Sequence, residues 1–298
     1  MTSEAFTVTV AMLEATGLSG EATVEERRAS IDSLEQLLPM AAGSSIEHID
    51  ADGVPAAWVG CRPPDPDAPA VLWLHGGGYN IGGIGSHRAA ASHLAATADL
   101  PVLLIDYRLA PEHPFPAAID DAVRAWGWLV AQGFDPSSLG LAGDSAGGGL
   151  ALALALRLRQ EQRPLPAAIA VLCPWVDLTG DHPVPEARRD ADVVLKPELL
   201  LEWAKAYAGG TDLDHPLISP LFAELSGLPP LRVEGAGRDV LLDDARRLVE
   251  RATNAQVNAE LIEAPEMIHA WHLFAGLFPE AAESLDGTGM WLRTHLGA

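Results

Sequence analysis

Residues 139–149 read Leu-Gly-Leu-Ala-Gly-Asp-Ser-Ala-Gly-Gly-Gly, and the interpretation of the whole chain starts from this stretch. It contains a G-x-S-x-G motif centred on Ser145, between an apolar run typical of a strand and a longer run typical of a helix. A serine on a sharp strand-to-helix turn needs strained backbone angles, and neighbouring glycines let the turn close. The following helix would direct its free N–H groups and its positive dipole end at the same point. The motif therefore predicts a nucleophilic serine rather than a bystander in a glycine-rich turn.

The segment after this serine, Leu150–Leu156, alternates leucine with alanine, which by periodicity alone would indicate a strand. Both residues are strong helix formers, however, and the segment has no β-branched residue. A helix with leucine at every second position is apolar on all sides, and such a helix is buried. We therefore expect a buried central helix here.

Short apolar runs recur along the chain, and from residue 70 each is followed by a turn cluster and then a helical stretch. Strands that alternate with helices predict βαβ units and a mainly parallel sheet. Runs without polar alternation indicate strands that helices cover on both faces. The expected strands are 46–49, 56–61, 70–74, 102–105, 139–142, 167–172, 231–233 and 257–262.

Two segments fall outside this rhythm. A capping box at residues 23–26 precedes apolar residues at helical spacing, so the N-terminal region is expected to hold at least one amphipathic helix. Residues 177–221 contain several prolines and a helical stretch over about 197–207, which favours an insertion above the sheet.

The composition excludes several classes of partner. The chain has 298 residues, with 41 acidic and 19 basic side chains and a formal net charge of −22. Nucleic acids and anionic membranes need clustered cations, and this chain has only two lysines. The longest uncharged apolar run, 146–156, is too short to span a membrane. No cation precedes Arg27, which is wrong for a signal peptide, so we expect a cytoplasmic protein.

The two cysteines, Cys61 and Cys173, lie far apart and match no metal-ligand spacing. Their number excludes a disulfide framework but not a single bridge; we expect two buried free thiols.

A second motif, His75-Gly76-Gly77-Gly78-Tyr79, directly follows the expected strand 70–74. Three consecutive glycines leave backbone N–H groups bare and able to approach a ligand closely. An oxyanion hole requires such groups, together with the N–H of the residue after the nucleophile, here Ala146. A phosphate-binding loop would need a lysine after the glycines, which is missing, and a plain flexible loop is the other alternative. His75 is expected to anchor the loop by hydrogen bonding.

A nucleophilic serine needs a base, and the base needs an orienting carboxylate. In the chain order nucleophile, acid, base, His269 lies just beyond the last expected strand and is the predicted base, with His272 as the alternative. Asp239 follows the preceding strand and a glycine turn and is the predicted acid, with Asp243 and Asp244 as alternatives. The two histidines form H-x-x-H, but no signature supplies a third ligand, so no metal is expected.

Five motifs together resemble the bacterial hormone-sensitive-lipase-like (HSL-type) esterases of the α/β-hydrolase superfamily. They are HGGGY (75–79), DYRLAPEHPFPA (106–117), GDSAGG (143–148), GRDVLLDD (237–244) and MIHAWHLF (267–274). The resemblance implies an α/β-hydrolase fold, with a mostly parallel eight-stranded sheet, helices on both faces and a helical cap. It divides the chain into N-terminal cap helices (1–45) and a catalytic domain (46–298) with a cap insertion at about 180–215.

The resemblance also assigns roles to matching residues. It makes Ser145 the nucleophile, Asp239 the acid, His269 the base, and Gly77, Gly78 and Ala146 the oxyanion donors. The chain departs from the family's usual pattern in Val240, where proline is common, and in Ala270, where glycine is common.

The DYRLAPE stretch supplies no general base in this interpretation. Asp106, Arg108 and Glu112 are expected to form a buried ion-pair and hydrogen-bond network under the oxyanion loop.

The expected activity is hydrolysis of short-to-medium acyl esters through an acyl-enzyme, without cofactor or metal, on a small-molecule substrate. Two alternatives remain: another acyl transfer on the same triad (amide, lactone or carbamate), and a ligand-binding receptor that has lost the catalytic histidine, which this chain keeps. The family often forms homodimers through the edge of the last strand. The residues expected to line the substrate pocket are Tyr79, Trp175, Val176, Trp203 and Tyr207.

Overall fold

The computed structural model describes residues 2–16 and 22–298, and these contain one eight-stranded sheet in the order β1-β2-β4-β3-β5-β6-β7-β8. Within this described part only β2 runs antiparallel to its neighbours, β1 and β4. The strands are β1 (Ser45–Asp50), β2 (Pro55–Gly60), β3 (Ala70–Leu74), β4 (Val102–Ile105), β5 (Leu139–Asp144), β6 (Ala168–Leu172), β7 (Leu231–Ala236) and β8 (Ala259–Ala264). Every strand expected from the sequence is present: β3 and β4 have the expected ends, and the ends of the other strands differ by at most three residues.

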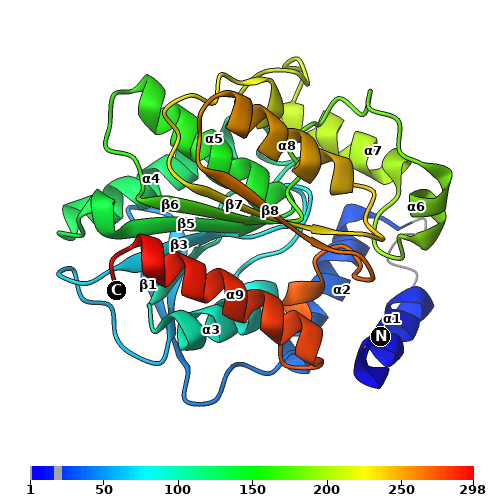
Figure 1. Cartoon of the computed structure of the whole chain (residues 1–298), viewed down its shortest axis with the longest axis horizontal. Coiled ribbons are helices and arrows are strands. Elements are labelled where there is room, and N and C mark those ends of the chain that lie inside the picture. The colour runs from blue at the N-terminus through cyan, green and yellow to red at the C-terminus, as the bar shows by residue number, and fades with distance from the viewer. Residues whose placement is uncertain (1, 17–21) are drawn as a thin grey trace.

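Helices cover both faces of the sheet (Figure 1). One face carries α4 (Ala117–Ala131), α5 (Ala146–Gln160) and α8 (Leu242–Asn254), and the other carries α3 (Ile84–Ala98) and α9 (Pro279–His295). Successive residues of the central strands point to opposite faces. In β3, Leu72 and Leu74 join the core under α4 and α5, whereas Val71 and Trp73 join the core under α3 and α9. All four side chains are fully buried, which explains the unbroken apolar runs of the sequence.

The alternating Leu/Ala segment is helical, as its residue types predict. It forms the middle of α5, and every residue from Ala146 to Leu156 is buried. Because α5 starts directly after Ser145, the helix fixes the position of this serine at the carboxyl edge of the sheet.

Four further helices, α1 (Glu4–Thr16), α2 (Val24–Leu37), α6 (Glu186–Ala191) and α7 (Pro197–Ala208), lie at one end of the sheet (Figure 1). The predicted capping box opens α2: the Thr23 N–H donates to Glu26 Oε2 (2.8 Å), and the Glu26 N–H donates to Thr23 Oγ1 (3.2 Å). These elements come from the two segments expected to form a cap. Their division into domains at residues 1–45 and 46–298 stays a prediction.

Arg28 of α2 ties the N-terminal segment to the rest of the molecule. Its Nε donates to the Asn80 carbonyl and one terminal nitrogen donates to the Ala110 carbonyl, both at 2.9 Å. Both terminal nitrogens also bind the Glu112 carboxylate, at 2.7 and 2.8 Å. The N-terminal segment is thereby attached to the loop that follows the three glycines.

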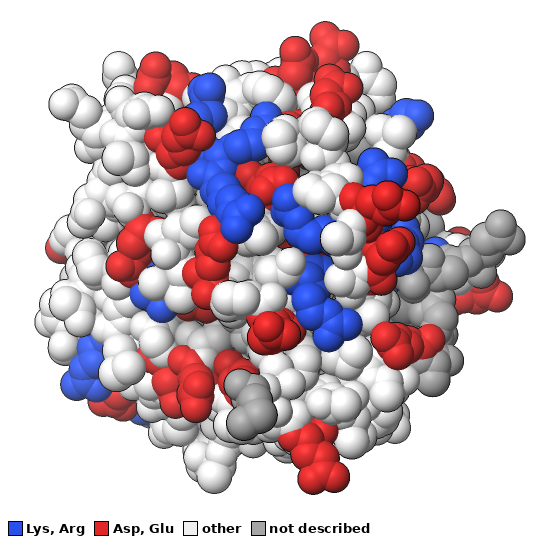
Figure 2. Space-filling view, turned by 45° about the vertical axis from the view of Figure 1, so that its right-hand side comes forward, with Lys and Arg blue, Asp and Glu red and all other residues white. Residues whose placement is uncertain are grey.

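The surface shows the excess of acidic over basic side chains that the composition indicates. Figure 2 shows basic side chains of one face interleaved with acidic ones, and several arginines are paired with carboxylates, among them Arg246 with Glu263. No helix in residues 2–16 or 22–298 is long and apolar enough to cross a membrane. The cytoplasmic location stays a prediction.

The prediction of two buried thiols is wrong for one of them. Cys173 is buried, but Cys61 is exposed, because it lies one residue beyond the end of β2, where the chain leaves the sheet.

Candidate active site

Ser145 occupies a strained turn between β5 and α5. Its φ and ψ are 52° and −122°, in a region that costs a non-glycine residue about 1–3 kcal/mol. The turn is held by backbone hydrogen bonds from the Ser145 N–H to the Leu172 carbonyl (2.8 Å) and from the Trp175 N–H to the Ser145 carbonyl (2.9 Å). A Cβ on Gly147 would overlap the carbonyl oxygen of Leu74, so the motif's glycine is required for close packing of helix and strand.

The three-glycine bend places its N–H groups beside this turn. Within the part of the chain that the structure describes, no hydrogen bond uses the N–H of Gly77, Gly78 or Ala146. Gly77 and Gly78 have φ values of 110° and 61°, which favour glycine. A Cβ on Gly78 would also overlap the Trp203 ring of α7, so only glycine lets the cap helix approach the bend so closely. The arrangement leaves donors free for an oxyanion.

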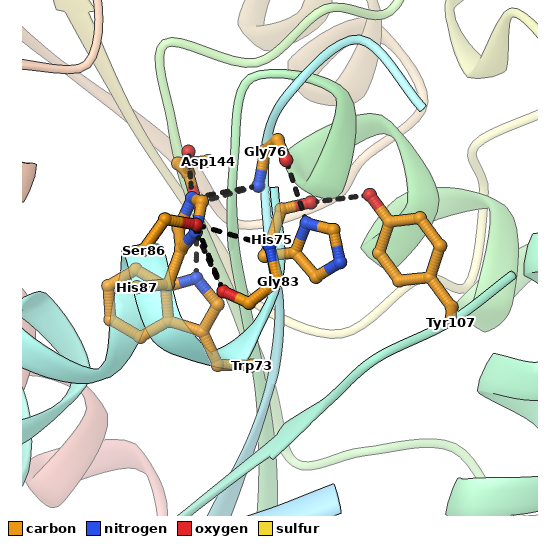
Figure 3. A network of polar contacts seen from close by, with 8 residues as sticks. All are labelled: Trp73, His75, Gly76, Gly83, Ser86, His87, Tyr107 and Asp144. Atoms are coloured by element: carbon orange, nitrogen blue, oxygen red, sulfur yellow. Dashed lines mark hydrogen bonds and ion pairs between the residues drawn. The ribbon is translucent and has the colours of Figure 1, made fainter. Parts of the chain in front are cut away.

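Figure 3 shows the polar network that holds the bend in place. The Asp144 carboxylate accepts hydrogen bonds through Oδ1 from Trp73 Nε1 and from the Gly76 N–H, both at 3.1 Å, and its Oδ2 lies 3.2 Å from His87 Nε2. Burial alone would raise the pKa of Asp144, but the His87 ring and these hydrogen bonds hold it well below its ordinary value. Asp144, which directly precedes Ser145, is therefore bonded to Gly76, the residue before the predicted oxyanion donor Gly77.

His75 anchors the bend, as predicted. Its Nδ1 lies 2.7 Å from the Gly76 carbonyl oxygen, and its ring stacks on Tyr107, with centroids 4.1 Å apart. The Tyr107 hydroxyl donates to the His75 carbonyl oxygen at 2.7 Å. Burial and the nearby His87 lower the pKa of His75 to about 3, so the ring is neutral and structural.

The structure brings His269 and Asp239 together. The parallel register of β7 and β8 pairs Ala236 with Ala264, so the loops after both strands leave the same edge of the sheet. His269 Nδ1 lies 2.7 Å from Asp239 Oδ2, and both side chains are buried. Burial alone would lower the pKa of His269, but Asp239 and two further carboxylates raise it above its ordinary value.

The alternatives to this pair lie elsewhere. Asp243 is paired with Arg188, and Asp244 accepts the N–H groups of Val176 and Asp177. Among the described residues, neither ring nitrogen of His272 has a hydrogen-bond partner, and burial lowers the pKa of His272 to about 3. His272 is thus a neutral packing residue beside His269, and its geometry does not favour it as the alternative base.

A cavity of about 100 Å³ joins these groups. Its wall includes Ser145, His269, Gly77 and Gly78, together with apolar residues of α2 and α7. Across the described residues no hydrogen bond joins Ser145 Oγ to the His269 ring. Such catalytic bonds are often long before substrate binds, and both side chains face the same space.

The expected pocket residues divide into three groups. Trp203 lines the cavity that holds Ser145, and Trp175 lines a neighbouring cavity of about 210 Å³ instead. Tyr79 and Tyr207 stack on each other with ring centroids 3.7 Å apart and, like Val176, are buried behind the wall of the Ser145 cavity. Because their surfaces are used in packing, a role for Tyr79, Val176 and Tyr207 in substrate contact is not supported by the lining of this cavity.

The predicted network in the DYRLAPE stretch is also wrong in its partners. Arg108 pairs with Asp121 of α4, with three contacts of 2.9 Å, rather than with its neighbours. Glu112 reaches out to Arg28 of the cap. Asp106 accepts the N–H of Ile84 at the start of α3. Each of the three side chains contacts a different helix, and the spacing of residues within this stretch does not predict such long-range contacts.

Three polar residues near the site were not predicted from the sequence. His87 supports Asp144, and Arg27 lies in the cavity wall with its guanidinium 5.9 Å from the centre of the Trp203 ring. Asp192 of the cap insertion is buried against the turn after Asp239. None of them belongs to a motif, so only the structure could find them.

One group of potential metal ligands occurs in the described ranges: donor atoms of Cys173, Asp239 and His269 lie within 4.8 Å of one another. The Asp239 oxygen and the His269 nitrogen are already hydrogen-bonded to each other at 2.7 Å, whereas two ligands of a tetrahedral zinc ion would lie about 3.3–3.4 Å apart. The set is better suited to orienting the imidazole than to holding a metal.

Comparisons with known proteins agree with this architecture. Residues 71–273 match a family described as having the alpha/beta hydrolase fold. An acetyl-hydrolase of Streptomyces hygroscopicus is 38% identical over 274 residues, which cover 92% of this chain and 91% of the relative. Carboxylesterase NlhH of Mycobacterium tuberculosis is 37% identical over 232 residues, covering 74% and 72%. A crystal structure of an esterase from the bacterial HSL family has a TM-score of 0.95, with 39% identity and full coverage of both chains.

The chain therefore belongs to the proteins with the α/β-hydrolase fold. Within them it is a member of the bacterial hormone-sensitive-lipase-like family, as the sequence motifs indicate.

Proposed function

We propose that this protein is a serine carboxylic-ester hydrolase that acts on short-to-medium acyl esters through an acyl-enzyme. The observation that carries the proposal is the shared cavity: it joins Ser145 to an imidazole already bound to a carboxylate and to three N–H groups that have no acceptor among the described residues. The names of the relatives, which include carboxylesterase and acetyl-hydrolase, point in the same direction.

In the proposed reaction Ser145 Oγ attacks the ester carbonyl carbon, and its proton moves to His269 Nε2. Asp239 holds the Nδ1–H, which fixes the tautomer and stabilises the imidazolium. The N–H groups of Gly77, Gly78 and Ala146 receive the oxyanion. The imidazolium then gives its proton to the leaving alcohol oxygen as the C–O bond breaks.

The second half of the reaction repeats these steps with water. His269 removes a proton from water, the resulting hydroxide attacks the acyl carbon, and Ser145 Oγ leaves with the proton returned by the ring. The atoms balance without a cofactor.

The small cavity favours short acyl groups. Its volume of about 100 Å³ is below the roughly 300–1,000 Å³ typical of pockets for drug-sized ligands. The homodimer and the alternative substrates (amides, lactones and carbamates) remain proposals that product analysis and solution mass measurements would test.

The test compares the wild type with Ser145→Ala on p-nitrophenyl acetate, butyrate, octanoate and palmitate. We expect Ser145→Ala to lose activity by several orders of magnitude, and the wild type to be fastest on the shorter esters. Ser226→Ala, at an exposed position, is the matched control. A fluorophosphonate label that maps to a peptide without Ser145, or a preference for palmitate, would contradict the proposal.

A further inference from the structure

The carboxylate of Asp192 in the cap lies against the turn that carries the proposed acid. Asp192 directly follows α6, and its side chain is 1% exposed. Its Oδ2 accepts a hydrogen bond from the N–H of Val240, the residue after Asp239, at 2.9 Å. Its Oδ1 accepts the N–H groups of Val194 and Leu195, each at 2.8 Å. The carboxylate is thus fixed by three backbone donors from two separate segments.

These donors belong to two parts of the site. Val194 and Leu195 line the cavity that holds Ser145, so they form the wall that the cap insertion supplies. Val240 belongs to the turn whose preceding residue binds His269. The bonds to Val194 and Leu195 are local and would occur in any such turn, whereas the bond to Val240 spans 48 residues of sequence. That long-range bond makes the position of the turn depend on the position of the cap.

Asp192 also contributes charge to the site. The groups that act on His269 include three carboxylates, of Asp239, Asp192 and Asp144, which raise its pKa against the effect of burial. Two other groups beside His269 are uncharged: burial lowers the pKa of the His272 ring to about 3 and raises the pKa of the Cys173 thiol.

Burial, followed by the nearby Asp239 charge, raises the pKa of Asp192, while His269 and the bonds from Leu195 and Val240 oppose this rise. Two cations bind backbone atoms of this segment: Lys196 Nζ donates to the Asp192 carbonyl (2.8 Å) and Arg238 to the Ala191 carbonyl (3.4 Å).

We propose that Asp192 is a positioning residue of the hydrolytic reaction: it fixes the Asp239 turn and the cap wall of the cavity together, so that the acid–base pair is aligned only when the cap is in place. This inference rests on the proposed serine-hydrolase function. A merely structural turn residue would affect stability but not the ionisation of the base, and this difference is measurable.

The test uses Asp192→Asn with Asp190→Asn as matched control, because Asp190 is exposed on the same short helix. The amide oxygen of asparagine can keep the local bonds, but its NH₂ group cannot accept from Val240, and the charge is lost. We expect kcat for p-nitrophenyl butyrate to fall by about 10- to 100-fold, with a smaller change in KM, since misplaced catalytic groups cost rates of this order. The acidic limb of the kcat/KM profile should move to lower pH, because one carboxylate acting on His269 is removed.

Val240→Pro separates the two effects, because it removes the N–H donor and leaves the Asp192 charge in place. We expect a lower kcat with the acidic limb at the wild-type position. The inference is overturned if Asp192→Asn keeps the wild-type kcat and acidic limb, or loses only thermal stability. Should Asp192→Asn not fold, a wild-type kcat in Val240→Pro overturns it equally. If the wild type is active and Ser145→Ala is inactive, the proposed function is upheld whatever Asp192→Asn shows. Failure of this inference can therefore be distinguished from failure of the proposed function.

Discussion

Asp144 is the residue whose replacement tests the architecture of the site most directly. Its buried carboxylate accepts from Trp73 and Gly76 and contacts His87. Asp144→Asn leaves one oxygen for the first two donors but puts an NH₂ group against His87. Asp144→Ala removes all three contacts; it leaves Trp73 Nε1 buried without its acceptor and the Gly76 N–H with only its 3.2 Å contact to His87 Nε2.

The magnitudes follow from these contacts. A hydrogen bond to a charged group contributes about 1.5–3 kcal/mol, so Asp144→Asn should lower the free energy of unfolding by about that amount at neutral pH. Asp144→Ala removes three buried contacts, and a buried donor left without a partner costs about 1–3 kcal/mol, so the loss for Asp144→Ala should be larger, about 3–5 kcal/mol. Because the pKa of Asp144 is lowered in the folded protein, its contribution is present above the ordinary Asp pKa and is lost as pH falls below it. The difference between wild type and Asp144→Asn should therefore shrink in acid.

Urea unfolding at several pH values measures these differences, with Asp214→Asn as the control, because Asp214 is exposed. Activity on p-nitrophenyl butyrate gives the second readout: the Gly76 bond orients the neighbouring proposed oxyanion donor, Gly77, and loss of one such donor costs about 10²–10³ in kcat. Asp144→Ala should approach this loss, and Asp144→Asn should lose less. Wild-type stability and kcat in Asp144→Ala would refute the reasoning.

Three further outcomes are expected. Arg28→Ala should lower the free energy of unfolding by about 1–3 kcal/mol, mainly through its two carbonyl bonds, because exposed ion pairs contribute little. Since Arg28 lowers the pKa of Glu112 to about 2, the part of this loss due to the pair should disappear as pH falls from 4.5 towards 2 in urea unfolding, and a pH-independent loss would contradict it. Burial raises the pKa of Asp244 from 3.8 to about 7, so its contribution to stability is lost as pH rises from 3.8 to about 7 and changes little above that. Wild-type thermal stability should therefore decline over this range while that of Asp244→Asn declines less; equal slopes in calorimetry would count against this. Finally, the raised pKa of His269 should place the acidic limb of kcat/KM above pH 6.5, and a limb below that value would be inconsistent with the paired carboxylate.

The sheet could be predicted from the sequence because it is covered on both faces. Buried strands such as β3 must be apolar throughout, and glycine-rich turns mark their ends, so the pattern is local. Ser145 and the three-glycine bend could also be predicted, because the glycines that their backbone conformations require are adjacent in the sequence. His269 and Asp239 could be placed because each follows a recognisable strand.

The rest depends on long-range partners. Arg108 has acidic neighbours along the chain but pairs with Asp121, because α4 folds back beside it. Tyr79 follows the glycine bend directly, yet it stacks on Tyr207, more than a hundred residues later, and so faces away from the cavity. Asp192 belongs to no sequence motif, and its proposed role follows only from its contact with Val240 in the folded structure.

The bend at Gly77 and Gly78 also has a consequence for how the protein could change. Its donors, with that of Ala146, have no acceptor within the described residues, and a buried donor left without a partner costs about 1–3 kcal/mol. A nearby side chain that offered them an oxygen would make the molecule more robust and would at the same time occupy the place where negative charge must form. Selection for thermal stability would therefore favour an acceptor at this bend, whereas selection for catalytic rate would keep the donors free. Thermostable variants that keep their rate should gain stability elsewhere in the fold.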